Sequence, residues 1–278
     1  MAERQQHKRR HGAGVAAGVL CVCLAGSGCA QSGAAADSRG SDALKVVRDA
    51  ADALVGVRSS KARTSMEMAT GGTRVTIRGE GVYDFRARVG RLKVLLPQDP
   101  AGATARRPIM ELLAPGALFM KNRGAGVPAD KWVRVDTRSL SDGNLVTGGA
   151  TDPFAAAEVL RGARTAKYVG DADVGGTAVR HYRGTADLGV AARKASEGNK
   201  EALAAAAKGF ATDQVPFDVY LDDAGRIRKV RHRFSFVNGQ QEGAVAVAST
   251  TLLYDFGAPV DVRLPEDDDI YAGKIAEE

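Results

Sequence analysis

Apolar and polar positions alternate along most of this chain, which is the pattern of β-strands with one buried face. Between residues 74 and 86 every second position is apolar or glycine, and the positions between them are mostly charged, with Val82 as the exception. Gly79 and Gly81 fall on the apolar face, which predicts one long strand or two strands kinked at the glycines. Further strands are predicted over residues 91–96, 109–113, 117–121, 132–136, 167–174, 177–188, 216–221, 226–237 and 245–254.

Three segments have the apolar spacing, the end signals or the composition of helices. We expect helices from about Ser41 to Gly56, from Asp152-Pro153 to about Arg164, and over residues 190–209 with a break near Gly198. Residues 30–41 are small and polar with no periodicity, which predicts a flexible tether before the first helix.

The order of these elements predicts an α+β fold. Strands joined by short turns, such as Gly175-Gly176 and residues 222–225, form antiparallel sheets. One face of a large curved sheet needs cover, and the three predicted helices are the elements that can supply it. The sequence therefore predicts a curved antiparallel β-sheet with helices over one face.

The N-terminus has the features of a bacterial export signal. Residues 1–14 carry four basic residues and one acid, an apolar stretch follows to Leu24, and small residues lead to Cys29. A basic start, an apolar run too short to span a bilayer and a small-residue exit are typical of secretory signals. We therefore expect residues 1–28 to be removed from the mature protein.

The residues before Cys29 resemble the lipobox of bacterial lipoproteins, in which the cysteine sulfur carries a diacylglycerol. Gly26 stands where that motif usually has Leu, three residues before the cysteine. The resemblance implies a lipid anchor on Cys29, residues 29–41 as its tether and residues 42–278 as one β-rich domain outside the cell membrane. An ordinary cleaved signal with an incidental cysteine is the alternative, and the general and twin-arginine export routes both stay open.

Composition narrows the function classes. Four of the 39 Lys and Arg residues but only one of the 33 acids lie in residues 1–28, so removal of the signal lowers the net charge from +6 to +3. Nucleic-acid binding needs a concentrated basic face, which this small excess does not favour. All three cysteines lie at or before Cys29, so the mature chain is expected to have no disulfide, no thiol nucleophile and no cysteine-ligated metal.

Four segments carry a resemblance to a known family: KWVRV at 131–135, VGGTAVRHYRGTADL at 174–188, VPFDVYLDDAGRIRKVRHRF at 215–234 and YDFGAPVDVRLPEDDDI at 254–270. In this order, and with the lipobox, the chain resembles actinobacterial lipoproteins of the LppX/LprG type, which share the fold of the LolA/LolB lipoprotein carriers. The resemblance implies a half-open antiparallel barrel with helices across its concave face. It also implies an apolar cavity for acyl chains between sheet and helices, and a membrane transporter as a possible partner.

Apolar strand residues are the candidates to line such a cavity, because acyl-chain sites have few polar groups. The candidates are Val75, Ile77, Tyr83, Phe85, Leu92, Val94, Leu96, Phe217, Val219 and Leu221. The same residues would fill a solid core equally well, so the sequence leaves open whether they line a cavity or plug it.

The densest basic stretch of the mature chain is residues 226–233. Arg228, Arg231 and Arg233 are candidate contacts to anionic lipid headgroups, since each basic residue near such a surface contributes about 1 kcal/mol. The alternative is a solvent-facing strand whose charges discourage edge-to-edge aggregation.

Catalytic patterns are scarce. His181 and His232 are the histidines outside the signal, each flanked by arginines in a predicted strand, and an ordinary strand position is the simpler interpretation of both. The chain has no Gly-x-Ser-x-Gly elbow and no phosphate-binding loop. Residues 266–269 are acidic but lack the spacing of a calcium loop, which favours a solvated loop. We expect no enzyme activity, no cofactor and no metal.

Two hypotheses follow from these observations. The first is a monomeric, membrane-anchored lipoprotein of the cell envelope that binds or shuttles lipids or glycolipids. The second is a non-enzymatic envelope module with a filled core that binds a protein partner or acts in sensing. A hydrolase with an unrecognised site, built on His181 or His232, is a third and weaker hypothesis.

Overall fold

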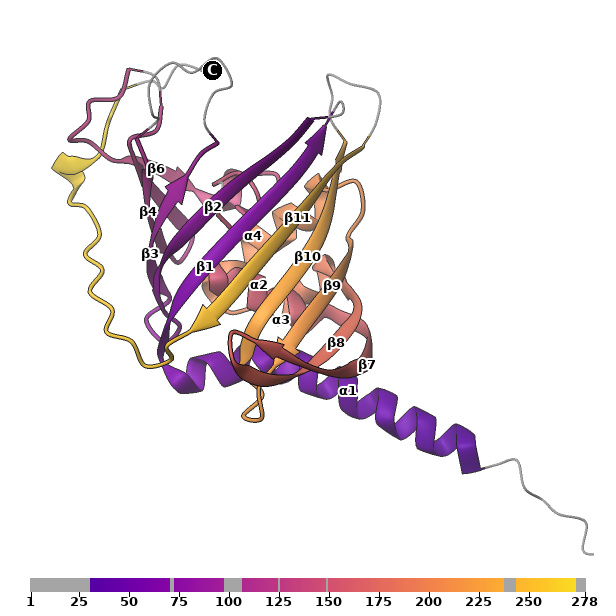
Figure 1. Cartoon of the computed structure of the whole chain (residues 1–278). Helices are drawn as coiled ribbons and strands as arrows, with labels where there is room; N and C mark the ends of the chain where they lie inside the picture. Colours follow the sequence, from indigo (N-terminus) through magenta and orange to yellow (C-terminus); the bar gives the residue numbers. More distant parts are fainter. Residues whose placement is uncertain are drawn as a thin grey trace, which may run out of the picture.

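A single antiparallel sheet of eleven strands dominates the computed structural model, which describes residues 31–70, 73–97, 107–124, 126–148, 150–237 and 244–273. The expected signal and Cys29 lie outside the described residues. The strand order is β6-β5-β4-β3-β2-β1-β11-β10-β9-β8-β7. The sheet is strongly curved and its edge strands β6 and β7 do not pair, so it stays open (Figure 1). The predicted α+β class and curved antiparallel sheet are confirmed.

The strands follow the predicted segments closely. They are β1 (Ser59–Thr70), β2 (Thr73–Asp84), β3 (Val89–Leu95), β4 (Ile109–Ala114), β5 (Ala117–Lys121), β6 (Val133–Asp136), β7 (Ala163–Val174), β8 (Thr177–Asp187), β9 (Gln214–Leu221), β10 (Ile227–Val237) and β11 (Ala244–Tyr254). The turn at Gly175-Gly176 joins β7 to β8, and both glycines have positive φ, as a tight hairpin requires.

Strand β1 has no counterpart in the prediction, although it joins the two halves of the sheet by pairing with β2 and β11. Its buried positions include Ser60, Ala62 and Thr64, so the apolar contrast between its two faces is weak. Small and polar residues with long charged neighbours have low strand propensity, and the sheet context decides the conformation instead.

Strand β2 is continuous through its two glycines. A Cβ at Gly81 would collide with the carbonyl oxygen of Arg91 on β3, and a Cβ at Gly79 would lie 2.6 Å from the Thr64 hydroxyl oxygen. The two glycines therefore allow the neighbouring strands to pack closely against β2.

The helices are α1 (Gln31–Val57), α2 (Pro153–Val159), α3 (Leu188–Lys194) and α4 (Glu197–Gly209), with 3-10 turns η1 (Thr137–Ser139), η2 (Leu160–Gly162) and η3 (Asp267–Asp269). The predicted start of the first helix near Ser41 is wrong by ten residues, because residues 31–41, predicted to be a flexible tether, are helical. Three alanines favour this extension, whereas the two glycines and three serines of the segment do not. The break in the third predicted helix falls at Ala195-Ser196, before rather than at Gly198.

The helices form a layer over one face of the sheet. Helices α2, α3 and α4 lie together behind the sheet in Figure 1, and α1 crosses one end of it next to β7. We call the covered side the inner face and the other side the outer face. Residues of the inner face and of the helices form one continuous hydrophobic core.

Candidate functional site

The candidate site is the inner face, because every residue predicted to line an acyl-chain cavity lies there or packs against its core. Val75 and Leu96 are half-buried and pack against the core. The other eight side chains are buried and belong to the core: Ile77, Tyr83, Phe85, Leu92, Val94, Phe217, Val219 and Leu221. The alternation in the sequence thus identified the right face of the sheet.

The inner face is filled in this structure. The side chains of Phe85, Leu92, Val94, Phe217, Val219 and Leu221 are each 0% exposed. A side chain that lined a space large enough for a water molecule would keep some accessible area, so these six contact protein atoms on all sides. Their role in holding a ligand stays a proposal, and it requires that the atoms above them move.

The helix layer above them combines alanines with larger apolar side chains, among them Val159, Leu188, Val190 and Leu203. The helix layer buries Ala155, Ala156 and Ala157 from α2, Ala191 and Ala192 from α3, and Ala202 and Ala206 from α4. The large buried side chains come mainly from the strands, with Phe154 of α2 as an exception that packs on Phe85 at a ring separation of 6.2 Å.

Hydroxyl groups interrupt the apolar inner face near its centre. Thr64 of β1 pairs in register with Thr251 of β11, and the hydroxyls of both are buried with no hydrogen-bond partner among the described residues. Two residues before Thr251 on β11, the Ser249 hydroxyl lies 2.5 Å from the hydroxyl of Thr151, which lies two residues before α2. The Thr151–Ser249 contact ties the start of the helix layer to the middle of the sheet.

His232 of β10 pairs in register with Ser249 of β11. It is the most deeply buried histidine of the described residues. Its Nε2 has no hydrogen-bond partner there. Burial lowers the pKa of its imidazole to about 3, so the ring is neutral at physiological pH. A neutral ring whose Nε2 makes no hydrogen bond to the neighbouring Ser249 hydroxyl fits the interpretation of His232 as a core residue.

Glu111 is a buried carboxyl group on the inner face of β4, between Leu92 of β3 and Met120 of β5. It is 0% exposed, and neither of its oxygens has a hydrogen-bond partner among the described residues. Burial raises the pKa of Glu111 to about 8, and the field of Arg123 opposes this rise only in part. Glu111 is therefore mostly protonated at neutral pH.

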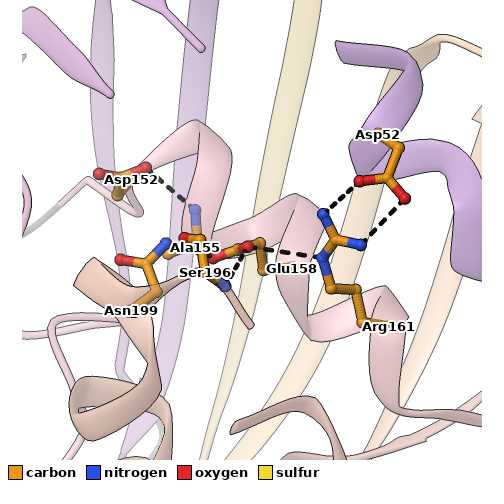
Figure 2. A network of polar contacts seen from close by, with 7 residues as sticks. All are labelled: Asp52, Asp152, Ala155, Glu158, Arg161, Ser196 and Asn199. Carbon is orange, nitrogen blue, oxygen red and sulfur yellow. Dashed lines mark hydrogen bonds and ion pairs between the residues drawn. The ribbon is translucent and has the colours of Figure 1, made fainter. Parts of the chain in front are cut away.

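Glu158 of α2 is the second fully buried acid, and its partners hold the helix layer together (Figure 2). The backbone N–H and hydroxyl of Ser196 donate to its two oxygens at 2.8 and 3.0 Å, and the Asn199 amide donates at 2.7 Å. Arg161 lies 3.4 Å from the same carboxylate and donates to Asp52 of α1 at 2.7 Å. One carboxylate thus joins α1, α2, η2 and the start of α4.

Residues 140–148 and 150–151, between η1 and α2, belong to a buried loop, which we call the inner loop. The Asp142 carboxylate accepts backbone N–H groups of Asn144, Val146 and Thr147, and Thr151 donates to the Leu145 carbonyl oxygen at 2.8 Å. These hydrogen bonds satisfy polar groups of the loop within the loop itself, and Leu145 is fully buried. The inner loop therefore lies inside the molecule as a folded unit.

The three candidate headgroup-binding arginines all have acidic partners. Arg228 donates to Asp222 at 2.9 Å, Arg231 to Glu67 at 3.3 Å, and Arg233 to Asp218 at 2.9 Å. Asp218 also accepts from His181 and Arg183, both at 2.8 Å. The basic stretch is thus partly neutralised, and His181 belongs to an ion cluster of the outer face.

Two hollows are described, and both lie on the outer face. One of about 390 Å³ spans β1, β2, β3 and β11 and includes Arg63, Arg78 and Leu95. The other, of about 570 Å³, lies over β3, β4 and β5 beneath the C-terminal segment. Neither hollow could be predicted from the sequence, because both depend on which strands become neighbours.

The part of the chain that the structure describes has no helix suited to cross a membrane and no cluster of metal ligands. None of the helices there combines the length and the apolar character that crossing a bilayer requires. The same residues contain no group of three or more His, Cys, Asp or Glu side chains that could hold a metal ion.

Comparisons with known proteins give likenesses in structure. No known protein family and no curated protein matches the chain. The chain is similar to the lipoprotein LppX of Mycobacterium tuberculosis, with 10% identity and a TM-score of 0.48 over 80% of this chain and 99% of LppX. It is similar to LprF of Mycobacterium bovis, with 16% identity and a TM-score of 0.40 over 82% and 98%. A domain of the outer membrane lipoprotein-sorting type from Vibrio parahaemolyticus matches with 10% identity and a TM-score of 0.33 over 80% and 94%.

The lipoprotein type that the sequence resembles is thus among the structures similar to this chain. At TM-scores below 0.5 these likenesses carry no argument about a ligand, which has to come from the chain's own residues.

Proposed function

We propose that the protein is a non-enzymatic lipoprotein of the cell envelope, anchored through Cys29 outside the cell membrane, that binds acyl chains of a lipid or glycolipid. The acyl chains would lie between the inner face and the helix layer. The observation that carries the proposal is the cover of a wide apolar sheet face by short helices whose buried side chains include seven alanines. An acyl chain gains about 0.8 kcal/mol per buried CH₂, so a long chain in that position offsets the loss of the contacts between helices and sheet.

The filled inner face corresponds, in this proposal, to the ligand-free closed state. Glu158 joins the helices, so the layer opens as one body rather than helix by helix. The contact between Thr151 and Ser249 lies where that body meets the sheet. Opening would break this contact, the hydrogen bond from the Tyr83 hydroxyl of β2 to Asp152, and those from Arg48 of α1 to the Ala163 carbonyl oxygen.

A disulfide across this contact tests whether the layer must move. The two hydroxyl oxygens are 2.5 Å apart, close to the roughly 2.05 Å of a disulfide, and residues 30–278 contain no other cysteine. We expect the oxidised Thr151→Cys, Ser249→Cys variant to lose uptake of a fluorescent fatty acid, and reduction to restore it. Equal uptake by the oxidised and reduced forms would contradict an acyl site beneath the helices.

The ligand itself is expected in the purified protein. Residues 30–278, expressed without the anchor, are extracted with organic solvent, and the extract is analysed by mass spectrometry. The proposal predicts a diacyl or triacyl lipid in stoichiometric amount. A clean extract together with no probe uptake would favour the second function, a protein-interaction or sensory module, which is the function consistent with a permanently filled inner face.

Contact of the basic strand with anionic headgroups is a further part of the proposal. Each exposed arginine at an anionic surface adds about 1 kcal/mol, but Arg231 and Arg233 already have acidic partners on the outer face. We expect the Arg231→Gln, Arg233→Gln variant to have a lower affinity for phosphatidylglycerol vesicles than wild type, by a factor of less than about ten. Vesicle sedimentation measures this, with Lys167→Gln on the edge strand β7 as the control. A loss no larger than that of the control would remove these arginines from the proposal.

A further inference from the structure

The C-terminal segment after β11, residues 255–273, runs over the outside of β3 and β4 as a strap (yellow in Figure 1). At its start the Gly257 N–H donates to the Ser59 carbonyl oxygen at 2.8 Å. Near its end the Tyr271 N–H donates to the Trp132 carbonyl oxygen at 2.8 Å, and Ile270 forms a parallel bridge with Trp132. The strap is therefore fixed at both ends, and its middle spans the sheet.

The hollow of about 570 Å³ lies beneath the middle of the strap, within the 300–1,000 Å³ usual for small-molecule sites. Four apolar side chains line it: Met110 and Leu112 of β4, Trp132 before β6, and Val262 of the strap. They adjoin a small buried cluster of the outer face that contains Leu112 and Phe119. An apolar floor is unusual on a sheet face that otherwise carries charged side chains.

The charged residues of the hollow are mainly cations. Arg91 pairs in register with Leu112, and Lys121 pairs with Met110, so both cations flank the apolar floor. The Lys121 ammonium nitrogen also lies 5.3 Å from the centre of the Trp132 ring. Arg263 of the strap adds a third cation, and Asp261, the acid in the lining, lies 3.8 Å from it. That ion pair is highly exposed and adds little to stability. With three cations and one acid in its lining, the hollow keeps a net positive charge.

We propose that this hollow is a second binding site, for a single-chain amphiphile with an anionic carboxylate or phosphate head. The acyl chain contacts Met110, Leu112 and Trp132 beneath the strap, and the head lies between Arg91 and Lys121. Apolar walls with a few convergent charged groups are the usual composition of such sites. The site is separated from the inner face by the sheet and does not depend on the function proposed above.

Trp132 makes the proposal directly testable, because it is the one tryptophan of the chain. Bromine quenches tryptophan emission only in close contact. We expect dodecanoate brominated at its methyl end, and brominated dodecyl phosphate, to quench Trp132 in a saturable titration of residues 30–278 below the aggregation concentration of the amphiphile. The affinity of the Arg91→Glu, Lys121→Glu variant for both amphiphiles should be lower by a factor of about ten or more. This is the effect expected from the loss of charge-assisted contacts.

Two control variants distinguish this site from nonspecific adsorption and from the inner face, and a third variant tests the contribution of the strap. Lys167→Glu on β7 makes the same kind of charge change at the far edge of the sheet and should leave the titration unchanged. The oxidised Thr151→Cys, Ser249→Cys variant should quench like wild type, since it closes only the inner face. Arg263→Glu, on the strap, should weaken binding without touching the sheet.

Three results would overturn the proposal. The first is no quenching by either anionic amphiphile. The second is equal quenching by a brominated dodecyl trimethylammonium ion, which has the same chain and the opposite charge. The third is equal binding by wild type and the Arg91→Glu, Lys121→Glu variant.

Discussion

Replacement of Glu158 with alanine is expected to lower the free energy of unfolding by about 3–5 kcal/mol, the cost of leaving buried partners of a charge unpaired. The variant removes the acceptor for the Ser196 N–H and hydroxyl and for the Asn199 amide, and it removes an ion-pair partner of Arg161. Because Glu158 is fully buried, water does not replace the lost contacts without opening the layer. Urea unfolding at constant pH measures the change.

A matched control comes from the outer arm of the same network. Asp52 accepts from Arg161 but is largely exposed, so Asp52→Ala should cost under about 1 kcal/mol. Glu158→Gln keeps the side-chain volume and one acceptor oxygen, and should fall between the two. If Glu158→Ala and Asp52→Ala destabilise equally, the network of Figure 2 does not hold the helices together.

The same variant bears on the proposed opening of the helix layer. A layer without its central carboxylate should release the inner face more readily, so Glu158→Ala is expected to take up a fluorescent fatty acid faster than Asp52→Ala. Stopped-flow fluorescence at a temperature where both variants are folded makes the comparison. Slower uptake by Glu158→Ala would contradict opening of the layer as a joined body.

Local pattern was sufficient for most strands and for the inner face. The period-two alternation of residues 74–86 correctly placed Ile77, Tyr83 and Phe85 on the buried side. It failed at β1, where Ser60 and Thr64 occupy inner positions that are apolar elsewhere. A strand between two others is stabilised by hydrogen bonds to both neighbours, and that contribution has no local signature in the sequence.

Long-range contacts account for the parts of the site that local pattern did not reveal. Glu111 and Glu158 have ordinary flanking residues, and their burial depends on residues of other elements, such as Leu92 for Glu111 and Ser196 for Glu158. The outer hollow likewise needs the strap to reach Trp132, 138 positions before Ile270.

The basic strand shows the same limit for charged residues. Sequence reasoning assigned headgroup contact to Arg228, Arg231 and Arg233 without their acidic partners. Those partners lie on other strands or across a turn, so the charge of the stretch is overestimated when it is counted along the chain.

Glu111 is expected to make stability depend on pH in a direction opposite to that of most carboxylates. In the folded protein its pKa is raised to about 8, whereas in the unfolded chain it titrates near 4.5. Between these values the unfolded chain releases a proton that the folded protein keeps, so the free energy of unfolding falls as pH rises, by about 1.4 kcal/mol per pH unit. The contribution of the protonated group is fully present below pH 4.5 and is lost by about pH 8.

His232 makes stability depend on pH in the opposite direction, and it does so at lower pH. Its folded pKa of about 3 lies below the usual 6.5, so stability falls as pH decreases from 6.5 towards 3. Between pH 4.5 and 6.5 the two groups oppose each other, and between 6.5 and 8 Glu111 acts without His232. The pH range from 6.5 to 8 is therefore the one in which the effect of Glu111 is measured cleanly.

Substitution of Glu111 with methionine is expected to raise the free energy of unfolding at pH 7.5 by several kcal/mol, because an apolar side chain of similar length replaces an unpaired carboxyl group. The gain should shrink as the pH falls to 4.5, where the carboxyl of wild type is protonated in the folded protein and half protonated in the unfolded chain. Urea unfolding at pH 4.5, 6 and 7.5 gives the slope, with Glu80→Met, which removes an exposed carboxylate from the outer face of β2, as the control. If the wild type and Glu111→Met differ by the same amount at all three pH values, Glu111 does not keep its proton in the folded protein, and the inner face of β4 is open to water.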